Sequence, residues 1–444
     1  MSHNPSCPAI LIAAPASGQG KTTVTSALAR LHARQGRRVR VFKCGPDFLD
    51  PYWHTLASGA PVYQMDLWMT GEDDCRTRLA QAAHEADLII IEGVMGLFDG
   101  DPSAADLAQR FGLPVMAVID AGSMAGTFGA LAYGLQHYRT GLRFAGVLAN
   151  RVASARHADM LKGSVQDASL WLGAVMRNAA FTLPERHLGL TVASEIPDAL
   201  QRLDAAADAL ADTPLGRMSL ADLQQWSVEF PDHEQTAVAA LQQPLKGRTV
   251  AVARDAAFCF IYAANLDCLR QLGAELVFFS PLTDAELPAC DAVWIPGGYP
   301  ELHAQAIAAN TSLRQSLERH IAAAKPVWAE CGGMMALFET LNTTEGERMP
   351  LWGLLPGEVT MNKRLAALGP QQLALASGTL RGHTFHYSTT QTALPVATRT
   401  SRPSTAPHDS DGEALWQQGS VRASYFHAWF PSCPAAVVEL FTAP

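Results

Sequence analysis

The chain lacks the features that mark membrane-spanning and secreted proteins. No apolar run approaches the ~20 residues that a bilayer span needs, and the first residues, Met-Ser-His-Asn-Pro-Ser, lack the charged and apolar regions of a signal peptide. The 8 cysteines are scattered and never form a C-x-x-C pair. This spacing argues against a zinc site or a disulfide framework and favours reduced thiols in a cytoplasmic protein.

An excess of basic residues is also absent. Lys and Arg number 33 against 42 Asp and Glu, a formal net charge of −9, so bulk attraction to nucleic acid or to an anionic membrane is not expected. An anionic substrate would have to be bound by local cations, for which Arg37, Arg38, Arg40 and Arg151 are candidates, although the first three could equally form a solvated surface. The length of 444 residues predicts two or three domains.

Short apolar segments alternate with helical stretches through the first half of the chain. Because nearly every residue in these segments is apolar, we predict parallel strands that are buried on both faces of a doubly wound α/β sheet. Such folds place their chemistry at the carboxyl ends of the strands, where Lys43, Glu92 and Asp120 occur. The predicted strands are residues 10–14, 39–43, 88–92, 115–120 and 144–150, and helical spacing occurs at 204–210 and 220–226.

A second α/β pattern starts after a polar, proline-containing segment. Its predicted strands are residues 248–253, 275–279, 292–295 and 326–329, with a later strand at 422–426. Residues 395–412, rich in Ser, Thr, Pro and Asp, are predicted to form an exposed loop. We therefore predict two doubly wound, mainly parallel-sheet domains, residues 1–235 and 248–444, joined by a linker at residues 236–247.

A loop of small residues between the first predicted strand and the next helical stretch is typical of a phosphate cradle. Loop amides and the helix N-terminus would face the anion, Lys21 would reach the outer phosphates, and Thr22 could bind Mg²⁺. Pro15 stands where the usual motif has a glycine, and a glycine-rich turn with a chance lysine is the alternative. The candidate ATP-binding residues are Ser17, Gly18, Gly20, Lys21, Thr22 and Thr23.

A cysteine elbow follows the predicted strand at residues 326–329. The neighbouring glycines permit a sharp strand-to-helix turn at Cys331, and a cysteine at the positive end of a helix is expected to have a lowered pKa that favours the thiolate. The amide of Gly332 and the amides around Gly298 could form an oxyanion hole. His427, after the late predicted strand, could act as the base, and a buried cysteine with a structural histidine is the alternative.

These C-terminal residues resemble a known family. From about residue 248 onward the chain resembles the class I, triad-type glutamine amidotransferase domain, which implies that Cys331 attacks the glutamine amide, that His427 assists, and that water clears the thioester after ammonia leaves. Most members have an acid two residues after the histidine, where this chain has Trp429. That departure matches the cobyrinate-type subgroup, which uses a Cys–His pair, so no third member is assigned.

The first half resembles the dethiobiotin synthetase-like ATP-dependent synthetases. The diagnostic string is Gly-Pro-Asp-Phe-Leu-Asp-Pro at residues 45–51, which is joined by residues 66–69 and 91–100. With the amidotransferase half, the whole chain resembles the cobyrinic or hydrogenobyrinic acid a,c-diamide synthase family. The resemblance implies a carbon–nitrogen ligase of cobalamin biosynthesis. Such an enzyme uses ATP and L-glutamine to amidate the a and c acetate carboxylates of a corrin-ring carboxylic acid through acyl phosphates.

The resemblance also implies roles for polar residues of the first half. Hard cations take oxygen ligands, and here Mg²⁺ would be held by Thr22, Asp47 and Glu92. Lys43 would bridge the γ-phosphate and the incoming carboxylate. Asp50 and Asp99 are assigned to substrate positioning or ammonia handling. Each of these acids has a structural alternative, which is to cap a helix or a turn.

Other functions stay open at this point. A nickel-sirohydrochlorin a,c-diamide synthase is a close relative, and a partitioning-type P-loop ATPase shares the loop, although such ATPases usually carry an extra lysine that is absent before Lys21. A non-catalytic tetrapyrrole-binding protein is disfavoured by the presence of both Cys331 and His427. The sequence leaves open whether the ring acid carries cobalt, the order of amidation and the oligomeric state, a homodimer included. Because free ammonia is mostly protonated at neutral pH, we expect a protected path from Cys331 to Lys43 and Glu92.

Overall fold

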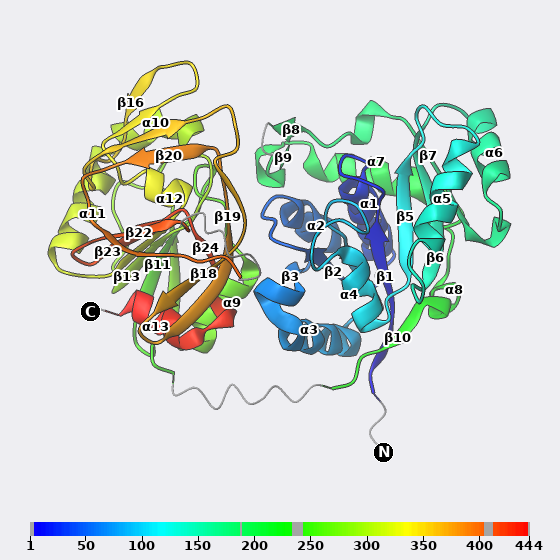
Figure 1. The fold of residues 1–444 in the computed structure, drawn as a ribbon, viewed down its shortest axis with the longest axis horizontal. Helices are drawn as coiled ribbons and strands as arrows, with labels where there is room; N and C mark the ends of the chain where they lie inside the picture. Colours follow the sequence, from blue (N-terminus) through cyan, green and yellow to red (C-terminus); the bar gives the residue numbers. More distant parts are fainter. Residues whose placement is uncertain (1–3, 187–188, 233–242, 404–411, 443–444) are drawn as a thin grey trace. The chain divides into compact units, whose positions relative to one another are not determined.

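The structure of the chain is a computed structural model that describes residues 4–186, 189–232, 243–403 and 412–442. The chain divides into two compact units, Met1–Thr236 and Ala237–Pro444, each with its own central sheet and core (Figure 1). Residues 236–242 of the predicted linker lie outside the described residues, so the domain bounds given above stay a prediction. Among the described residues, no helix is long and apolar enough to cross a membrane.

A mainly parallel sheet of 8 strands forms the centre of the first unit. Its strands run in the order β3-β2-β4-β1-β5-β6-β7, all parallel, and β10 pairs antiparallel with the start of β1. This arrangement confirms the predicted doubly wound sheet, and β4 and β5 occupy the predicted residues. The strands are β1 (Ser6–Ala13), β2 (Val39–Cys44), β3 (Tyr63–Met65), β4 (Leu88–Glu92), β5 (Val115–Asp120), β6 (Phe144–Val152), β7 (Trp171–Met176) and β10 (Ser227–Glu229).

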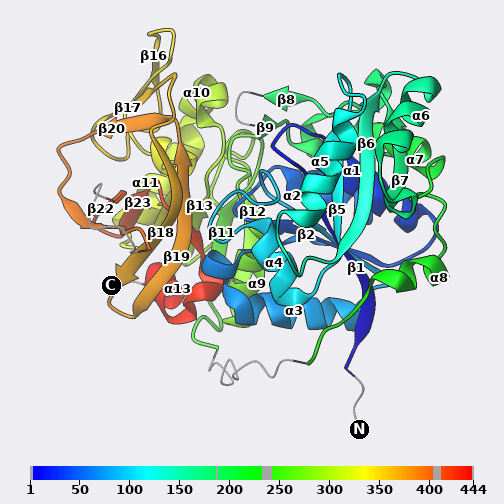
Figure 2. The same ribbon diagram turned by 45° about the vertical axis from the view of Figure 1, so that its right-hand side comes forward.

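Helices cover both faces of this sheet (Figures 1 and 2). One apolar core joins the sheet to α3, α4, α5 and α6, and the other joins it to α1, α2, α7 and α8, which is why the strands are apolar on both sides. The predicted helical stretch at 220–226 is split into α8 and a 3₁₀ turn, Gln224–Trp226. The helices are α1 (Lys21–Arg34), α2 (Asp50–Ser58), α3 (Glu72–Glu85), α4 (Ala104–Phe111), α5 (Thr127–His137), α6 (Ala155–Ser164), α7 (Ala199–Ala211) and α8 (Leu220–Leu223). Shorter elements are the π-helix Leu67–Gly71, the 3₁₀ turns Ala168–Leu170, Ala179–Phe181 and Ala193–Glu195, and the paired strands β8 (Glu185–Arg186) and β9 (Gly189–Leu190).

The second unit is built on a sheet of 7 strands in the order β12-β11-β13-β14-β23-β22-β21. The first five strands in this order are parallel, and β22 and β21 add on as antiparallel strands. The predicted strands at 275–279 and 292–295 are confirmed residue for residue. The strands are β11 (Thr249–Ala253), β12 (Glu275–Phe279), β13 (Ala292–Ile295), β14 (Val327–Glu330), β21 (Val396–Arg399), β22 (Ala414–Gln418) and β23 (Val421–Ser424).

Two smaller sheets and five helices complete the described part of the second unit. The small sheets have the orders β16-β15-β17-β20 and β18-β19-β24. Their strands are β15 (Thr340–Asn342), β16 (Arg348–Pro350), β17 (Glu358–Met361), β18 (Ala367–Leu375), β19 (Gly378–His386), β20 (Ser388–Gln391) and β24 (His427–Trp429). The helices are α9 (Ala263–Gln271), α10 (Pro300–Ala309), α11 (Thr311–Ala322), α12 (Gly332–Met335) and α13 (Pro434–Phe441), with a 3₁₀ turn at Phe430–Ser432.

Two sequence predictions for this unit are corrected by the structure. Residues 396–399 of the predicted exposed loop form β21 at the edge of the sheet, whereas residues 404–411 lie outside the described part of the chain. The late predicted strand ends at Ser424, and His427 begins β24 in a different sheet. The backbone therefore changes sheets between these two residues, which apolar periodicity does not reveal.

Candidate active sites

The loop between β1 and α1 is closed around the side chain of Lys21. Lys21 is the first residue of α1 and is 7% exposed. Its Nζ donates to the carbonyl of Ala16 at 3.2 Å and to that of Met95 at 2.6 Å. Burial lowers the pKa of the Lys21 ammonium, and the nearby Glu92 carboxylate opposes this effect.

The same loop is anchored to the ends of β5 and β6. The side-chain amide of Asn150 donates to the carbonyl of Gln19 at 2.9 Å, and the guanidinium of Arg151 donates to the carbonyl of Gly18 at 2.9 Å. Gly20 has φ +93°, and a Cβ atom built there would lie 2.1 Å from Nδ2 of Asn150. The loop therefore needs glycine at position 20 both for its backbone conformation and for space.

A buried carboxylate lies beside this loop at the end of β4. Oε1 of Glu92 accepts from Oγ1 of Thr22 at 2.8 Å and lies 3.1 Å from Nζ of Lys43, the residue that faces it in register on β2. Oε2 of Glu92 contacts Nε2 of His54, and Nδ1 of His54 lies 2.9 Å from Oγ of Ser26. Burial would raise the pKa of Glu92, but Lys43 and His54 outweigh it and hold the pKa below its usual value.

Lys43 joins this carboxylate to two more acids at the start of α2. Its Nζ lies 2.6 Å from Oδ2 of Asp50 and 3.8 Å from Oδ2 of Asp47. Burial would lower the pKa of Lys43, but Asp50, Glu92 and Asp47 raise it well above its usual value. Asp47 also accepts from the amides of Leu49 and Asp50, so it caps this turn as the structural alternative proposed, while its other oxygen faces Lys43. Burial, together with Asp50, raises the pKa of Asp47.

These residues surround one cavity of about 680 Å³. Asp120, for which no role was predicted, also lines this cavity, and its Oδ2 lies 2.7 Å from Nη1 of Arg151. The sequence-predicted residues that line the cavity are Ser17, Gly18, Gly20, Lys21, Thr22, Thr23, Lys43, Asp47, Asp50 and Glu92. Asp99 is not among the lining residues, and its carboxylate instead accepts from the amide of Gly96 at 2.9 Å, which shapes the turn after β4.

Three of the four candidate substrate-binding arginines do not reach this cavity. Arg38 pairs with Asp87 and Arg40 pairs with Glu85, while Arg37 contacts His32. These are contacts at the ends of strands and helices, in line with the alternative of a solvated surface. Of the four candidate arginines, Arg151 is the one that lines the cavity.

Sequence reasoning missed two kinds of residue at this site. His54 stands four residues after Asp50 on α2, and that helical spacing is the signal that could have placed it beside the acids. The segment from Met176 to Leu183, which follows β7 and lines the cavity, carries no motif that points to a ligand.

In the second unit, the predicted elbow is a sharp turn between β14 and α12. Cys331 has φ 45° and ψ −110°, a strained conformation for a residue other than glycine, and its amide donates to the carbonyl of Ser424 at 2.7 Å. Burial raises the pKa of the Cys331 thiol above its usual value, although the amide of Gly332 lowers it. The expectation of a lowered pKa is therefore wrong for the resting site, because α12 has only 4 residues and burial outweighs its N-terminal amides.

Glycine backbones bring three segments together around this turn. A Cβ atom built on Gly332 would lie 2.9 Å from the amide nitrogen of Gly298, and one built on Gly297 would lie 2.5 Å from Cε1 of His427. The loop after β13 thus packs against both the elbow of Cys331 and the imidazole. Close backbone approach of this kind is possible only without side chains, so glycine is required at these positions.

His427 is buried on the other side of this loop. Its ring stacks on His383 of β19, with centroids 4.9 Å apart and planes 17° apart, and its Nδ1 lies 4.0 Å from Oε2 of Glu330. Burial, with help from His383 and His386, keeps the pKa of His427 well below its usual value. The imidazole is therefore neutral near pH 7.

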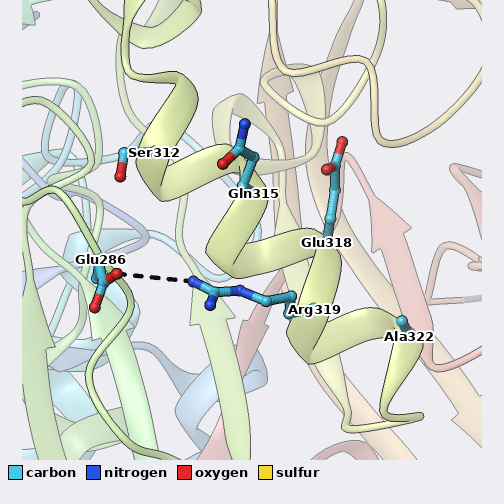
Figure 3. A pocket seen from close by; sticks show the side chains of 6 residues that line it. All are labelled: Glu286, Ser312, Gln315, Glu318, Arg319 and Ala322. Atoms are coloured by element: carbon cyan, nitrogen blue, oxygen red, sulfur yellow. Dashed lines mark ion pairs between the residues drawn. The ribbon is translucent and has the colours of Figure 1, made fainter.

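A further hollow of about 540 Å³ runs along α11 and contains none of these groups (Figure 3). Its charged pair is Arg319 and Glu286, 3.8 Å apart and 70% and 72% exposed. Exposed pairs of this kind contribute little to binding or stability, so the hollow has no chemistry comparable to the two sites. Its lining residues are Glu286, Ser312, Gln315, Glu318, Arg319 and Ala322.

Comparison with known proteins identifies both units. Residues 10–190 match the CobQ/CobB/MinD/ParA nucleotide binding domain, and residues 249–434 match the CobB/CobQ-like glutamine amidotransferase domain. The chain is 56% identical to the hydrogenobyrinate a,c-diamide synthase of Pseudomonas aeruginosa over 98% of this chain and 97% of that protein. It is 55% identical to the protein of the same name in Stutzerimonas stutzeri, over 98% of each chain. It is 50% identical to the cobyrinate a,c-diamide synthase of Herminiimonas arsenicoxydans, over 98% of this chain and 96% of that one. The chain therefore belongs to the family of the hydrogenobyrinate and cobyrinate a,c-diamide synthases.

Proposed function

We propose that the protein catalyses the ATP- and glutamine-dependent amidation of the a and c acetate carboxylates of cobyrinic or hydrogenobyrinic acid in cobalamin biosynthesis. One observation carries this proposal. A phosphate-binding loop with a buried lysine–carboxylate cluster and a cysteine elbow with a buried histidine occur in the two units of a single chain. The presence of the second unit disfavours a partitioning-type ATPase.

In the first unit, the protein activates a carboxylate by phosphorylation. A carboxylate is a poor acyl donor, and transfer of the γ-phosphoryl group makes an acyl phosphate that ammonia can attack. Catalysis of this transfer depends mainly on positioning and on neutralising charge. The loop amides and Lys21 would bind the phosphates, and Lys43 would contact both the γ-phosphate and the incoming carboxylate. Asp50, 2.6 Å from Lys43, would hold this ammonium in place.

The donor set of the first site fits Mg²⁺. Thr22, Glu92 and Asp47 offer only oxygen atoms, and they line the same cavity. The described residues contain no cluster of three or more His, Cys, Asp or Glu side chains that would hold a metal unaided, but Mg²⁺ usually binds one or two carboxylates together with phosphate oxygens. When bound with ATP, it would neutralise phosphate charge. Asp99 would act indirectly, because it shapes the turn near Met95, whose carbonyl accepts from Lys21.

In the second unit, the protein releases ammonia from L-glutamine. His427 would accept the proton of Cys331, and the thiolate would attack the carboxamide carbon. The amides of Gly298 and Gly332 would donate to the oxyanion, and His427 would return the proton to the departing ammonia. Water would then cleave the thioester and release glutamate. We also propose that the protein works in the cytoplasm, as a homodimer.

Product analysis with the purified protein tests this function. ATP, Mg²⁺ and ¹⁵N-amide glutamine are offered with cobyrinic acid, hydrogenobyrinic acid or nickel-sirohydrochlorin, and mass spectrometry counts the amides formed. Two labelled amides on a corrin-ring acid are expected, and the preferred acid tells whether cobalt must already be present. Diamidation of the nickel compound alone would identify the alternative enzyme, and no amide on any acid would refute the proposal.

A competition experiment tests the protected path for ammonia. Excess unlabelled ammonium is added to the reaction with labelled glutamine. The label is expected to persist in the product, because ammonia generated at Cys331 would not mix with the solvent. Ready dilution of the label would show that ammonia passes through open solution. The Cys331→Ala variant is the control, since it should incorporate unlabelled ammonium alone.

A further inference from the structure

Glu330 is a buried acid to which neither the sequence motifs nor the proposed reaction assigns a role. It is the last residue of β14, directly before Cys331, and is 2% exposed. Its Oε1 accepts from the indole of Trp328 at 2.7 Å and from the amide of Ala428 at 3.3 Å. A buried carboxylate is costly unless it is hydrogen-bonded or paired, so these donors fix where it lies.

The second oxygen of Glu330 faces the imidazole of His427. Oε2 lies 4.0 Å from Nδ1, within ion-pair distance but beyond a direct hydrogen bond. The amide that anchors Oε1 belongs to Ala428, the next residue after His427, so the carboxylate is tied to the same strand as the imidazole. Hydrogen bonds of catalytic groups are often long before substrate binds and shorten in the reacting complex.

We propose that Glu330 is a positioning residue of the glutaminase site, which orients His427 and stabilises the imidazolium formed when the Cys331 thiol gives up its proton. This inference rests on the proposed glutaminase reaction. The acid would then come from the residue before the nucleophilic cysteine. Related triads instead have an acid two residues after the histidine, where this chain has Trp429. Glu330 ends β14, and Cys331 follows it directly in the turn before α12.

Electrostatics support this role. Burial raises the pKa of Glu330 to about 8, although the donors Trp328 and Ala428 oppose it. An imidazolium nearby would lower that pKa again, because an opposite charge favours the ionised form. Glu330, ionised with its own proton released to solvent, would therefore pair with the imidazolium that forms when Cys331 gives its proton to His427.

Other titratable groups face the two reacting side chains. His383 and His386 of β19 lower the pKa of His427. Glu301 of α10 and Glu413 act on Cys331, together with Glu330 itself, and all three carboxylates oppose ionisation of the thiol. The proposed role and a direct effect of the Glu330 charge therefore change the pKa of the Cys331 thiol in opposite directions. Through His427, Glu330 would favour ionisation of Cys331, whereas a direct effect of its charge would oppose it.

The experiment measures alkylation of Cys331 by iodoacetamide as a function of pH in the full-length protein. Mass spectrometry of the Cys331 peptide separates it from the other thiols. Glu330→Gln keeps an oxygen that can accept from Trp328 and Ala428 while removing the charge. We expect the alkylation midpoint to rise by about one pH unit, and kcat for glutamine hydrolysis to fall about 10- to 100-fold with little change in KM. Ammonium-supported amidation should stay unchanged.

Two further variants distinguish the proposed role of the Glu330 carboxylate from other effects of the substitution. Glu330→Asp retains the carboxylate and should keep the midpoint nearer to that of the parent protein than Glu330→Gln does. Glu413→Gln removes another carboxylate that acts on the thiol, one that pairs with His386 at 3.0 Å, and should lower the midpoint. A midpoint that is unchanged or lowered in Glu330→Gln, or equal shifts in the Gln and Asp variants, would overturn the proposal. Alkylation needs neither ATP nor a ring acid, so failure of the amidation assay leaves this result interpretable.

Discussion

Lys43 is a single buried cation that lies between several carboxylates. Its side chain is 4% exposed, and it lies between Asp50 at 2.6 Å and Glu92 at 3.1 Å. Removing one partner of a buried ionic cluster leaves the others uncompensated, which costs far more than removing an exposed pair. Arg40, on the same strand, forms such a more exposed pair with Glu85 at 2.8 Å. The two positions therefore make a matched comparison.

We predict that Lys43→Met lowers the free energy of unfolding of the first unit by about 3–5 kcal/mol, whereas Arg40→Met lowers it by about 0–1 kcal/mol. Urea unfolding monitored by circular dichroism measures both values. ATP-dependent amidation should be lost in Lys43→Met even below its unfolding temperature and retained in Arg40→Met. Equal losses of stability in the two variants would contradict the assignment of Lys43 as the centre of a buried cluster.

His383 gives the second prediction at this scale. Burial lowers its pKa to about 3, and its Nδ1 lies 3.3 Å from the hydroxyl of Tyr262. The unfolded chain, with a histidine pKa of about 6.5, binds the proton more readily. The stability that this group contributes is therefore complete above about pH 6.5 and is lost as the pH falls toward 3.

The expected outcome is a flatter acid limb in the variant His383→Gln. Its unfolding free energy should fall less between pH 6.5 and 4 than that of the parent protein, when both are measured by urea titration at each pH. His137, an exposed histidine on α5, serves as the control position for the replacement of a histidine. A parent slope that persists in His383→Gln would show that other groups cause the acid sensitivity.

Functional residues that stand in a recognisable motif were predictable from the sequence. Residues whose role depends on a partner far away in the chain were not. Lys21, Cys331 and Gly20 stand in recognisable strings. His54 and Glu330 gain their roles from contacts with Glu92 and His427, which lie 38 and 97 residues away in the chain. Such pairs depend on how elements far apart in the chain come together, and for His54 the helical spacing from Asp50 is the one local signal.

At the scale of elements, the loop before α1 shows how two glycines with similar backbones differ in their surroundings. Gly18 has φ +76° and Gly20 has φ +93°, so a side chain is strained at either position. A Cβ atom on Gly18 meets nothing within 4 Å, whereas one on Gly20 would lie 2.1 Å from Nδ2 of Asn150. Asn150 also donates to Gln19, and therefore holds the loop closed.

We predict that Gly20→Ala weakens ATP binding at least about tenfold more than Gly18→Ala does. Both variants bear the backbone strain of about 1–2 kcal/mol, but only Gly20→Ala must also displace Asn150 and open the loop. Calorimetric titration with ATP gives the two dissociation constants. Similar affinities in the two variants would mean that strain alone, and not the contact with Asn150, determines the effect.

The elements themselves were predictable where they are buried on both faces. β4, β5 and β13 are short apolar runs of this kind, and the structure places them at the predicted residues. β12, a partly buried edge strand, also occupies its predicted residues. β18 was not predicted, because it carries Gly369-Pro370 and Gln371-Gln372 and is partly exposed along its length. Strands of that kind are stabilised by the pairing of β18 with β19, which the sequence does not encode as a local period.

At the scale of the whole molecule, the first unit closes on itself before the second begins. β10 pairs antiparallel with β1, with Ser6 opposite Glu229 and Pro8 opposite Ser227, and the neighbouring Trp226 is 4% exposed. The last described segment of this unit is therefore bound to its first strand. The cores of the first unit contain residues up to Phe230, and those of the second begin at Leu245.

We therefore predict that residues 1–236 fold without the rest of the chain, and that they amidate the ring acid with ATP and ammonium but not with glutamine. Residues 1–225 should be much less stable, because they lack β10 and Trp226, whose removal leaves the start of β1 at Ser6–Pro8 unpaired and leaves a cavity. Thermal unfolding of the two fragments measures the difference, and mass spectrometry of the ring acid measures activity. Equal stability of the two fragments would show that β10 and Trp226 do not stabilise the first unit, and failure of residues 1–236 to fold would show that this unit is not independent.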